Sequence, residues 1–320
     1  MTSKEIFKMA VEMKNPPGVP IIFFNRNKEK SDAVIMQYDA ADSFAPDVTG
    51  RSEWGFIWHT VDDTMGQPTH SPLIDSIKLP GNYTAPDPNA PGRFNNMKKA
   101  ISENRDKYFI ADLGISGFNL VTFIRGFDNV LTDLYEDPDG ISELIDIVFD
   151  YETQIIKNYC ELEIDAVAFY DDWGTQASLM ISPIMWRQIF KERYRKQFDL
   201  IHSYGKHVFF HSCGQVMDII PDFIEIGADI LNLNQPSIFG IQNLGEKFAG
   251  KVCFNCPVDH QTVAINGTKE EIYQYVHDLN KYLNTKNGGF VANIEDYQSC
   301  GMSNENYHNI VSAFMSLNEK

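Results

Sequence analysis

From about residue 106 onwards, short apolar runs alternate with longer amphipathic stretches. The apolar runs are rich in β-branched and aromatic residues and cover 108–112, 166–170, 208–210, 230–233, 252–254 and 289–293. Apolar strands that are separated by helices predict a parallel sheet buried on both faces. Two earlier runs, 19–23 and 33–36, belong to the same pattern. The total of about eight strands is that of a closed (β/α)8 barrel.

The stretches between these runs carry the signals that begin and end helices. Ser182 offers a capping hydroxyl directly before Pro183, which suits the first helical position. Thr268 and Glu271 have the spacing of a capping box. Residues 1–9 have the pattern of an amphipathic helix start. Glycines stand where three helices should end before the next strand: Gly205, Gly227 and Gly250.

An open, doubly wound sheet would show the same alternation of strands and helices. Such a fold commonly carries a glycine-rich phosphate loop after its first strand, and no Gly-x-Gly-x-x-Gly occurs in this chain. We therefore expect an α/β fold, a (β/α)8 TIM barrel, as a single domain over residues 1–320.

Residues 26–105 differ from the rest because they are irregular and rich in turns. Prolines are concentrated between residues 68 and 91. Residues 54–58 and 60–62 are typical of two short strands of a hairpin. Long irregular segments of this kind usually form a lid or a substrate-facing insert, and we expect that role here.

The composition indicates a globular protein and disfavours polyanionic partners. Of the 320 residues, 43% are hydrophobic, and the net charge of −17 repels nucleic-acid backbones and anionic membrane surfaces. No segment approaches the roughly 20 apolar residues of a membrane span, and the first residues do not form a secretory signal. Five cysteines do not suit a disulfide framework. We expect a reduced, cytoplasmic protein without nucleic-acid or membrane partners.

Polar residues follow the predicted strands closely. They lie in the segments 170–174, 211–214, 234–236, 256–260, 295–296 and 299–301. In a barrel, the loops at the carboxyl ends of the strands hold the active site. The fold alone does not require carboxylates, thiols, amides and imidazoles there, so this bias predicts a functional rim.

The sharpest signal at this rim is the pair His211-x-Cys213. Both side chains point to one side of an extended segment, and imidazole nitrogen and thiolate sulfur are ligands that Zn²⁺ favours. A catalytic zinc uses three protein ligands, and Cys300 at another strand end supplies the third, with Cys256 in reserve. The competing interpretation is a hydrogen-bonded core histidine and a buried cysteine. The remaining cysteines are expected to be structural: Cys160 and Cys253.

Three carboxylates are catalytic candidates. Asp171 and Asp172 are adjacent, so only one can face the barrel mouth; one could accept a hydrogen bond from a metal-bound imidazole or cap the following turn. Glu295 is placed to be a displaceable ligand or a proton acceptor. The aromatic residues of the insert could also simply pack it against the barrel. Expected substrate-binding residues come from the insert and the rim: Arg26, Trp54, Trp58, Tyr170, Asn234 and Gln235.

Motifs over most of the chain carry a family resemblance. They lie in residues 1–5, 52–55, 171–176, 181–187, 207–214, 234–236 and 304–306. In these segments the chain resembles the uroporphyrinogen decarboxylase superfamily, and within it the zinc-dependent methyltransferases that act with corrinoid proteins. The resemblance implies a (β/α)8 barrel and implies that His211, Cys213 and Cys300 hold zinc. The decarboxylases of the superfamily lack this ligand set and need no metal.

The resemblance also suggests a reaction. After Cys300 the chain reads Gly301-Met302-Ser303, without the proline-containing stretch of the coenzyme M enzymes. This favours transfer of a methyl group from a small O-methyl donor, such as a phenyl methyl ether, to the Co(I) corrinoid of a partner protein. Three alternatives remain: methyl transfer from a corrinoid to a thiol, metal-free tetrapyrrole decarboxylation, and a binding protein with a structural zinc. The sequence leaves open whether the chain forms a homodimer.

Overall fold

Eight parallel strands form the central sheet, and each lies where an apolar run predicts one. The computed structural model describes residues 1–61, 66–77 and 83–319. The strand order is β1-β10-β9-β8-β7-β6-β5-β2, with every neighbouring pair parallel. The strands are β1 (Ile21–Phe23), β2 (Ala33–Gln37), β5 (Tyr108–Ile115), β6 (Ala166–Tyr170), β7 (His207–His211), β8 (Ile230–Asn232), β9 (Cys253–Cys256) and β10 (Phe290–Ile294).

The sheet curls into a nearly closed barrel. Its two end strands, β1 and β2, are consecutive in the chain, and the backbone N–H of Asp32 donates to the carbonyl of Ile21 at 2.9 Å across the turn between them. The 3₁₀ helix η1 (Lys28–Lys30) lies in this turn. The expected (β/α)8 barrel is therefore confirmed.

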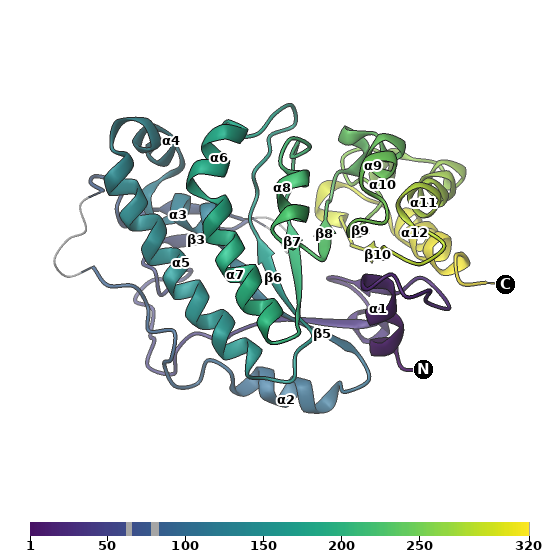
Figure 1. The fold of residues 1–320 in the computed structure, drawn as a ribbon, viewed down its shortest axis with the longest axis horizontal. Coiled ribbons are helices and arrows are strands. Elements are labelled where there is room, and N and C mark those ends of the chain that lie inside the picture. The colour runs from purple at the N-terminus through teal and green to yellow at the C-terminus, as the bar shows by residue number, and fades with distance from the viewer. Residues whose placement is uncertain (62–65, 78–82, 320) are drawn as a thin grey trace.

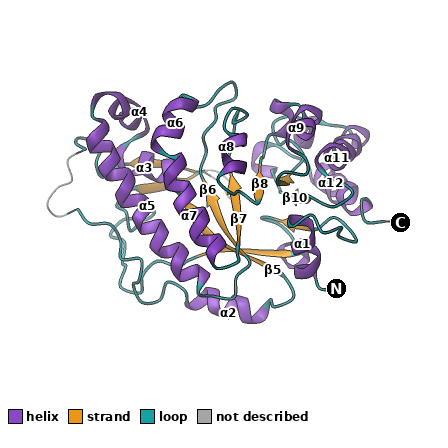
Figure 2. Ribbon diagram, in the orientation of Figure 1, coloured by secondary structure: helices purple, strands orange, loops and turns teal. Residues whose placement is uncertain are grey.

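Helices cover the outside of the barrel, and α5 and α7 lie side by side along its surface (Figures 1 and 2). The first six are α1 (Ser3–Val11), α2 (Asn95–Glu103), α3 (Gly117–Arg125), α4 (Phe127–Glu136), α5 (Pro138–Cys160) and α6 (Pro183–Ile189). The others are α7 (Lys191–Ser203), α8 (Ile220–Glu225), α9 (Ile241–Phe248), α10 (Val263–Asn266), α11 (Lys269–Leu283) and α12 (Asn304–Ser316). Two further 3₁₀ helices are η2 (Pro236–Phe239) and η3 (Gln298–Cys300). Over the described residues, no helix is long and apolar enough to cross a membrane.

The helix boundaries follow the capping signals of the sequence. The Ser182 hydroxyl accepts from the backbone N–H of Met185, with Pro183 opening α6. Thr268 and Glu271 form a reciprocal capping box at the start of α11. Gly205 has a φ of +69°, a left-handed conformation that suits glycine at the end of α7. Local sequence therefore sets where these helices begin and end.

The insert contains a hairpin, but its strands are shifted from the predicted positions. β3 (Ile57–Thr60) pairs antiparallel with β4 (Gly66–His70). Of the predicted second strand, Thr60 ends β3, Val61 follows it, and Asp62 lies outside the described residues. Trp54 and Phe56 precede β3, and their side chains are buried, at 6% and 7% exposure, in the core under the insert.

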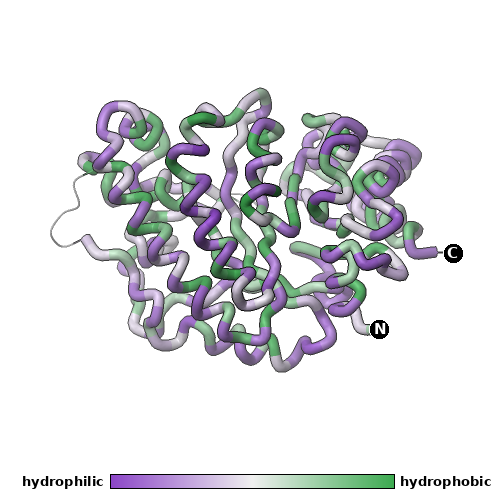
Figure 3. Tube along the Cα trace, in the orientation of Figure 1, coloured by the Kyte–Doolittle hydropathy of each residue, from purple (hydrophilic) through white to green (hydrophobic). Residues whose placement is uncertain are grey.

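The core has two layers. One lies inside the barrel and contains small and aromatic side chains such as Ala168, Phe209 and Cys253. The other lies between the strands and the surrounding helices, and it contains Cys160 and Cys256. Hydrophilic and hydrophobic positions alternate along the outer helices, as expected for helices with one buried face (Figure 3). This packing holds the carboxyl ends of the strands in fixed positions.

Candidate metal centre

Three potential metal ligands meet at the carboxyl end of β7. Asp172, His211 and Cys213 each offer a ligand atom, and these atoms lie within 4.8 Å of one another. The Nε2 atom of His211 lies 3.5 Å from the Sγ atom of Cys213 and 3.3 Å from the Oδ1 atom of Asp172. Nitrogen, sulfur and carboxylate oxygen are the ligand types of protein zinc sites. The donor set therefore fits a zinc ion.

Two glycines allow the loops after β6 and β7 to approach closely. A Cβ atom on Gly214 would lie 2.0 Å from the carbonyl oxygen of Gly174, so neither backbone could come this near with a larger residue. Gly214 also has a φ of +77°, which favours glycine. The backbone N–H of Cys213 then donates to Asp172 Oδ1 at 2.7 Å. This contact brings the carboxylate of one loop to the His-x-Cys pair of the other.

The adjacent aspartates have different environments. Asp171 is fully buried and accepts from the backbone N–H groups of Phe118 and Asn119, at 3.0 and 2.8 Å, and from the Tyr194 hydroxyl. It therefore caps α3, a helix about fifty residues earlier, and not the turn that follows it. Asp172 is the member of the pair that faces the metal ligands. The partner of the His211 Nδ1 atom is Asn232 Oδ1, at 2.5 Å, so neither aspartate holds that side of the imidazole.

His211 and Asp172 stabilise each other's charged forms. Burial lowers the pKa of His211, but Cys213 and Asp172 outweigh it and hold that pKa well above its usual range. Burial raises the pKa of Asp172, yet the hydrogen bond and charge of His211 bring it below the ordinary value. The shift of Asp172 reflects the attraction between its carboxylate and the imidazolium of His211, whereas burial raises the pKa of the Cys213 thiol.

A cavity of about 360 Å³ lies beside the cluster. Its lining is Phe24, Asn25, Tyr170, His211, Cys213, Asn232, Asn234, His260, Glu295, Tyr297 and Cys300. Cys300 is thus in the same cavity as His211 and Cys213, although it does not belong to the group of atoms within 4.8 Å. Cys256 is fully buried, is not part of this lining, and has its thiol pKa raised by burial to about 12.

The predicted rim residues lie in or beside this cavity. Tyr170 lines it, with its ring 5.0 Å from that of His211. Asn234 lines it as well, and its buried Oδ1 atom has no hydrogen-bond partner among the described residues. Glu295 lines it and accepts from Asn293 Nδ2 at 2.7 Å. Gln235 is buried behind the lining, where it accepts from the N–H of Gly214 and supports the β7 loop.

The predicted residues of the insert lie elsewhere. Arg26 contacts Asp296 and the ring of Tyr307 and is not in the lining. Trp54 packs edge-to-face on Tyr151, with ring centroids 5.0 Å apart, and lines a different cavity. Trp58 packs against Phe123, with ring centroids 5.5 Å apart. The two tryptophans therefore fasten the insert to the barrel.

Five lining residues were not among the sequence candidates: Phe24, Asn25, Asn232, His260 and Tyr297. His260 follows β9 and Tyr297 follows β10, so the strand-end rule that identified Glu295 could have identified both. The buried Nδ1 atom of His260 has no hydrogen-bond partner among the described residues. Burial and the nearby Glu295 hold the pKa of Tyr297 well above its usual value. These groups add polar recognition and an aromatic surface to the cavity.

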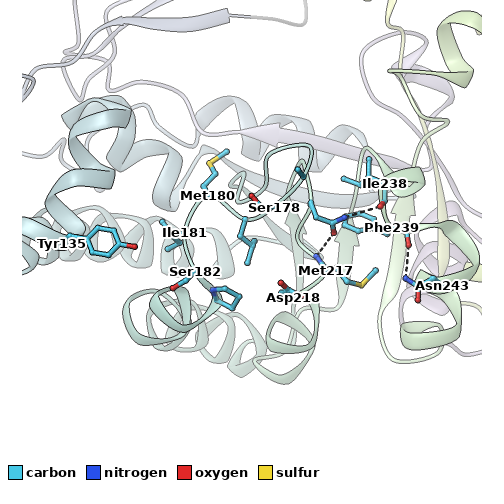
Figure 4. A pocket seen from close by; sticks show the side chains of 14 residues that line it. Tyr135, Ser178, Met180, Ile181, Ser182, Met217, Asp218, Ile238, Phe239 and Asn243 are labelled. Carbon is cyan, nitrogen blue, oxygen red and sulfur yellow. Dashed lines mark hydrogen bonds between the residues drawn. The ribbon is translucent and has the colours of Figure 1, made fainter.

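A second and larger cavity, of about 580 Å³, is lined in part by Gln215, Met217 and Asp218, which follow β7 (Figure 4). Met180, Ile181 and Met217 give it an apolar part, and Ser178 and Asp218 add polar groups (Figure 4). Its lining contains no histidine and no cysteine. The metal ligands therefore distinguish the smaller cavity as the candidate site.

Comparison with known proteins places the fold and the family. The family model described as uroporphyrinogen decarboxylase (URO-D) matches residues 62–317. Among solved structures, a methyltransferase from Methanosarcina mazei aligns with a TM-score of 0.74 and 14% identity, covering 99% of each chain. A D-psicose 3-epimerase aligns with a TM-score of 0.43 and 12% identity, covering 69% of this chain and 81% of its own. No curated protein matches the sequence.

Proposed function

We propose a methyl-transfer function for this chain, which belongs to the uroporphyrinogen decarboxylase (URO-D) family. In this proposal the protein is a zinc-dependent methyltransferase that moves a methyl group from an O-methyl donor to the Co(I) corrinoid of a partner protein. The observation that carries the proposal is the nitrogen, sulfur and oxygen cluster of His211, Cys213 and Asp172 beside a cavity at the carboxyl ends of the strands. A metal-free decarboxylase has no need of this donor set.

The ligands proposed for zinc are His211, Cys213 and Cys300. The first two already lie together, and Cys300 lies in the same cavity on the short helix η3. Asp172 provides a carboxylate within reach of the same point and could complete or leave the coordination. Bound zinc would supply the Lewis acidity that a poor leaving group such as a phenoxide requires.

The other lining residues suit an aromatic ether. Tyr170, Tyr297 and Phe24 give the cavity three aromatic side chains beside the cluster. Asn234 and His260 offer buried polar atoms without partners among the described residues, so a polar substituent of the donor could satisfy them. This combination of aromatic walls and a few polar groups is typical of small-molecule sites.

The proposed reaction balances without an external oxidant. The carbon–oxygen bond of the donor breaks, and its electron pair remains with the oxygen as an alkoxide or phenoxide. The methyl group forms a bond with the corrinoid cobalt of the partner, and Co(I) provides both electrons of that bond. The chain contributes the orientation of the donor, through the cavity lining and the buried imidazole of His211.

Metal analysis and a methyl-transfer assay test the proposal together. Purified protein should contain close to one zinc per chain and should methylate a Co(I)-loaded corrinoid protein when a methoxy-aromatic compound is present. Cys300→Ala should lose zinc affinity, whereas the matched variant Cys256→Ala, at a buried cysteine outside the lining, should keep it.

Three other outcomes of these experiments would each assign a different function to the protein. Thiol-dependent removal of methyl from a methylated corrinoid, with no response to any methoxy-aromatic compound, would assign the thiol-methylating reaction. Full activity toward a tetrapyrrole in protein without zinc would assign a decarboxylase. Zinc bound by four protein ligands, with no exchange for small ligands, would assign a structural metal.

A further inference from the structure

We propose that Asn232 and Asn255 form an amide relay that keeps a proton on Nδ1 of His211 and thereby presents Nε2 to the metal. The relay connects three neighbouring strands, β7, β8 and β9, and ends on a backbone carbonyl of β10. The metal-binding part of this inference rests on the proposed function. The position of the proton follows from the hydrogen bonds alone.

The relay starts at the carbonyl oxygen of Val291, which can only accept a hydrogen bond. Asn255 Nδ2 donates to this oxygen at 3.1 Å, so Asn255 Oδ1 points to its other neighbour. Asn232 Nδ2 donates to that Oδ1 and to the Asn255 carbonyl, both at 2.8 Å. Since neither of these two oxygens can donate, the Asn232 amide has one favourable orientation.

The same reasoning determines which ring nitrogen of His211 carries the proton. With its nitrogen turned toward Asn255, Asn232 presents Oδ1 to the Nδ1 atom of His211, 2.5 Å away. An amide oxygen only accepts, so Nδ1 must carry the proton. In the neutral imidazole, Nε2 then holds the lone pair, and it is the atom that faces Cys213 and Asp172. A backbone carbonyl three links away thus selects the metal-binding nitrogen.

Sheet register and burial hold the relay in one hydrogen-bonding arrangement. His211 is paired with Asn232, Asn232 with Asn255, and Asn255 with Val291 in the parallel ladder. Asn232 is 3% exposed and Asn255 is 1% exposed, so water does not compete for their hydrogen bonds. A buried amide that lost its partner would carry the full cost of desolvation, about 1–3 kcal/mol. Flipping any one amide would break contacts at both of its ends.

The relay uses neutral amides where a carboxylate would also accept from Nδ1. This choice matters because Asp172 already brings negative charge to the other side of the imidazole, and Cys213 would add more as a zinc-bound thiolate. A second carboxylate would add to that charge and would strengthen proton binding at His211 as well as metal binding. The amide orients the ring and leaves the charge of the site unchanged.

Nitrogen NMR of ¹⁵N-histidine-labelled protein tests the relay directly. The His211 signals can be assigned by their loss in His211→Gln. We expect Nδ1 to remain protonated in both zinc-free and zinc-loaded protein, with only Nε2 changing when zinc is added. Loss of the Nδ1 proton when zinc binds, or a bare Nδ1 beside a protonated Nε2, would overturn the relay. In protein that never binds zinc, an Nδ1 that keeps its proton at high pH, after Nε2 has lost its own, would support the relay and contradict the proposed function.

Zinc competition with a chelator tests the two asparagines. Asn232→Leu should weaken zinc binding about 10- to 100-fold, the range for loss of a partner behind a metal ligand. Asn232→Asp should keep the protonated Nδ1, because a carboxylate also accepts, but should lower the stability of the protein because its second oxygen faces two acceptors. Asn255→Leu should have a smaller effect, since Asn232 keeps its oxygen but loses its fixed orientation.

Asn293→Leu is the matched control. Asn293 is 2% exposed in the same barrel, and its Nδ2 donates to Glu295, outside the relay. The Asn293→Leu variant should retain both zinc affinity and the His211 proton at Nδ1. Zinc binding by Asn232→Leu as tight as by Asn293→Leu would show that the asparagines have only a packing role.

Discussion

The insert (residues 26–105) and the rim formed by the loops after β6 to β10 both contain aromatic, charged and amide side chains. At the rim, those side chains lie around one cavity, with His211, Cys213 and Asp172 in mutual reach. In the insert, Trp54 and Trp58 pack on Tyr151 and Phe123. The difference shows that residue type alone does not mark a site. At the rim, parallel strands bring residues from distant parts of the chain to one edge.

The largest expected effect comes from the rim. His211→Ala removes the only member of the cluster whose nitrogen faces both Cys213 and Asp172. We expect zinc affinity and methyl transfer to fall by more than about 100-fold. Loss of a ligand itself should cost more than loss of a residue that only hydrogen-bonds to a ligand, which costs about 10- to 100-fold. Chelator competition and the corrinoid assay measure the two losses. Unchanged thermal unfolding would show that the barrel is intact, whereas retained stoichiometric zinc would remove His211 from the ligand set.

The insert should respond to substitution in the opposite way. Trp54 is 6% exposed and contacts Tyr151, so Trp54→Ala leaves a cavity under the insert. We expect a loss of about 3–5 kcal/mol in the free energy of unfolding, with zinc affinity unchanged. Denaturant unfolding and zinc titration provide the two readouts. A variant that unfolds like the parent protein but no longer accepts the methyl donor would place Trp54 in substrate binding.

A buried carboxylate outside the cavity should make stability depend on pH. Glu152 accepts from the N–H of Gly117 at the start of α3, and burial raises its pKa to about 7 from 4.5. Because the folded-state pKa is the higher one, its contribution to stability is complete below about pH 4.5 and is lost as the pH rises through about 7. The shift corresponds to roughly 3 kcal/mol.

Glu152→Gln should flatten this part of the pH profile. Chemical unfolding at a series of pH values between 4.5 and 7.5 would show a shallower fall in stability for the variant than for the parent protein. Asp171 also has its pKa raised by burial, so part of the slope should remain. Parallel profiles for the two proteins would mean that Glu152 is ionised in the folded state throughout this range.

The regular half of the chain was largely predictable because its signals are local. Apolar runs located the eight strands, and capping residues such as Ser182 and Thr268 located helix starts. The strand-end rule then identified the neighbourhood of His211, Cys213 and Asp172. These signals work because strand burial and helix capping depend on a few adjacent residues.

The remaining features depend on contacts between distant residues. Asp171 caps α3, and nothing in its own neighbourhood indicates a helix fifty positions earlier. Trp54, which was predicted to lie in a strand, precedes β3 and packs on Tyr151, nearly one hundred residues away. The relay from His211 to Val291 requires the strand register, which apolar runs do not specify. Whether Cys300 completes the ligand set stays a prediction for the metal analysis.

The smallest expected effect concerns Arg26, at the boundary between the two regions. Its Nη1 atom lies 3.0 Å from Asp296 Oδ2 and 3.0 Å from Asn304 Oδ1, and its guanidinium lies 4.2 Å above the ring of Tyr307. These contacts join the loop after β1 to the last strand loop and α12. Its side chain is 34% exposed, so solvent screens the ion pair, and Arg26→Met should cost less than about 1 kcal/mol of stability.

The same variant distinguishes a structural arginine from a substrate-binding one. If Arg26 only joins the two ends of the barrel, KM for the methyl donor and zinc affinity should stay within about twofold of the parent protein, because a residue outside the lining makes no contact that the transition state could strengthen. A KM raised tenfold or more at unchanged stability would show that the insert reaches the substrate after all. In that case the two regions would form one site, and the separation between rim and insert would apply to the metal alone.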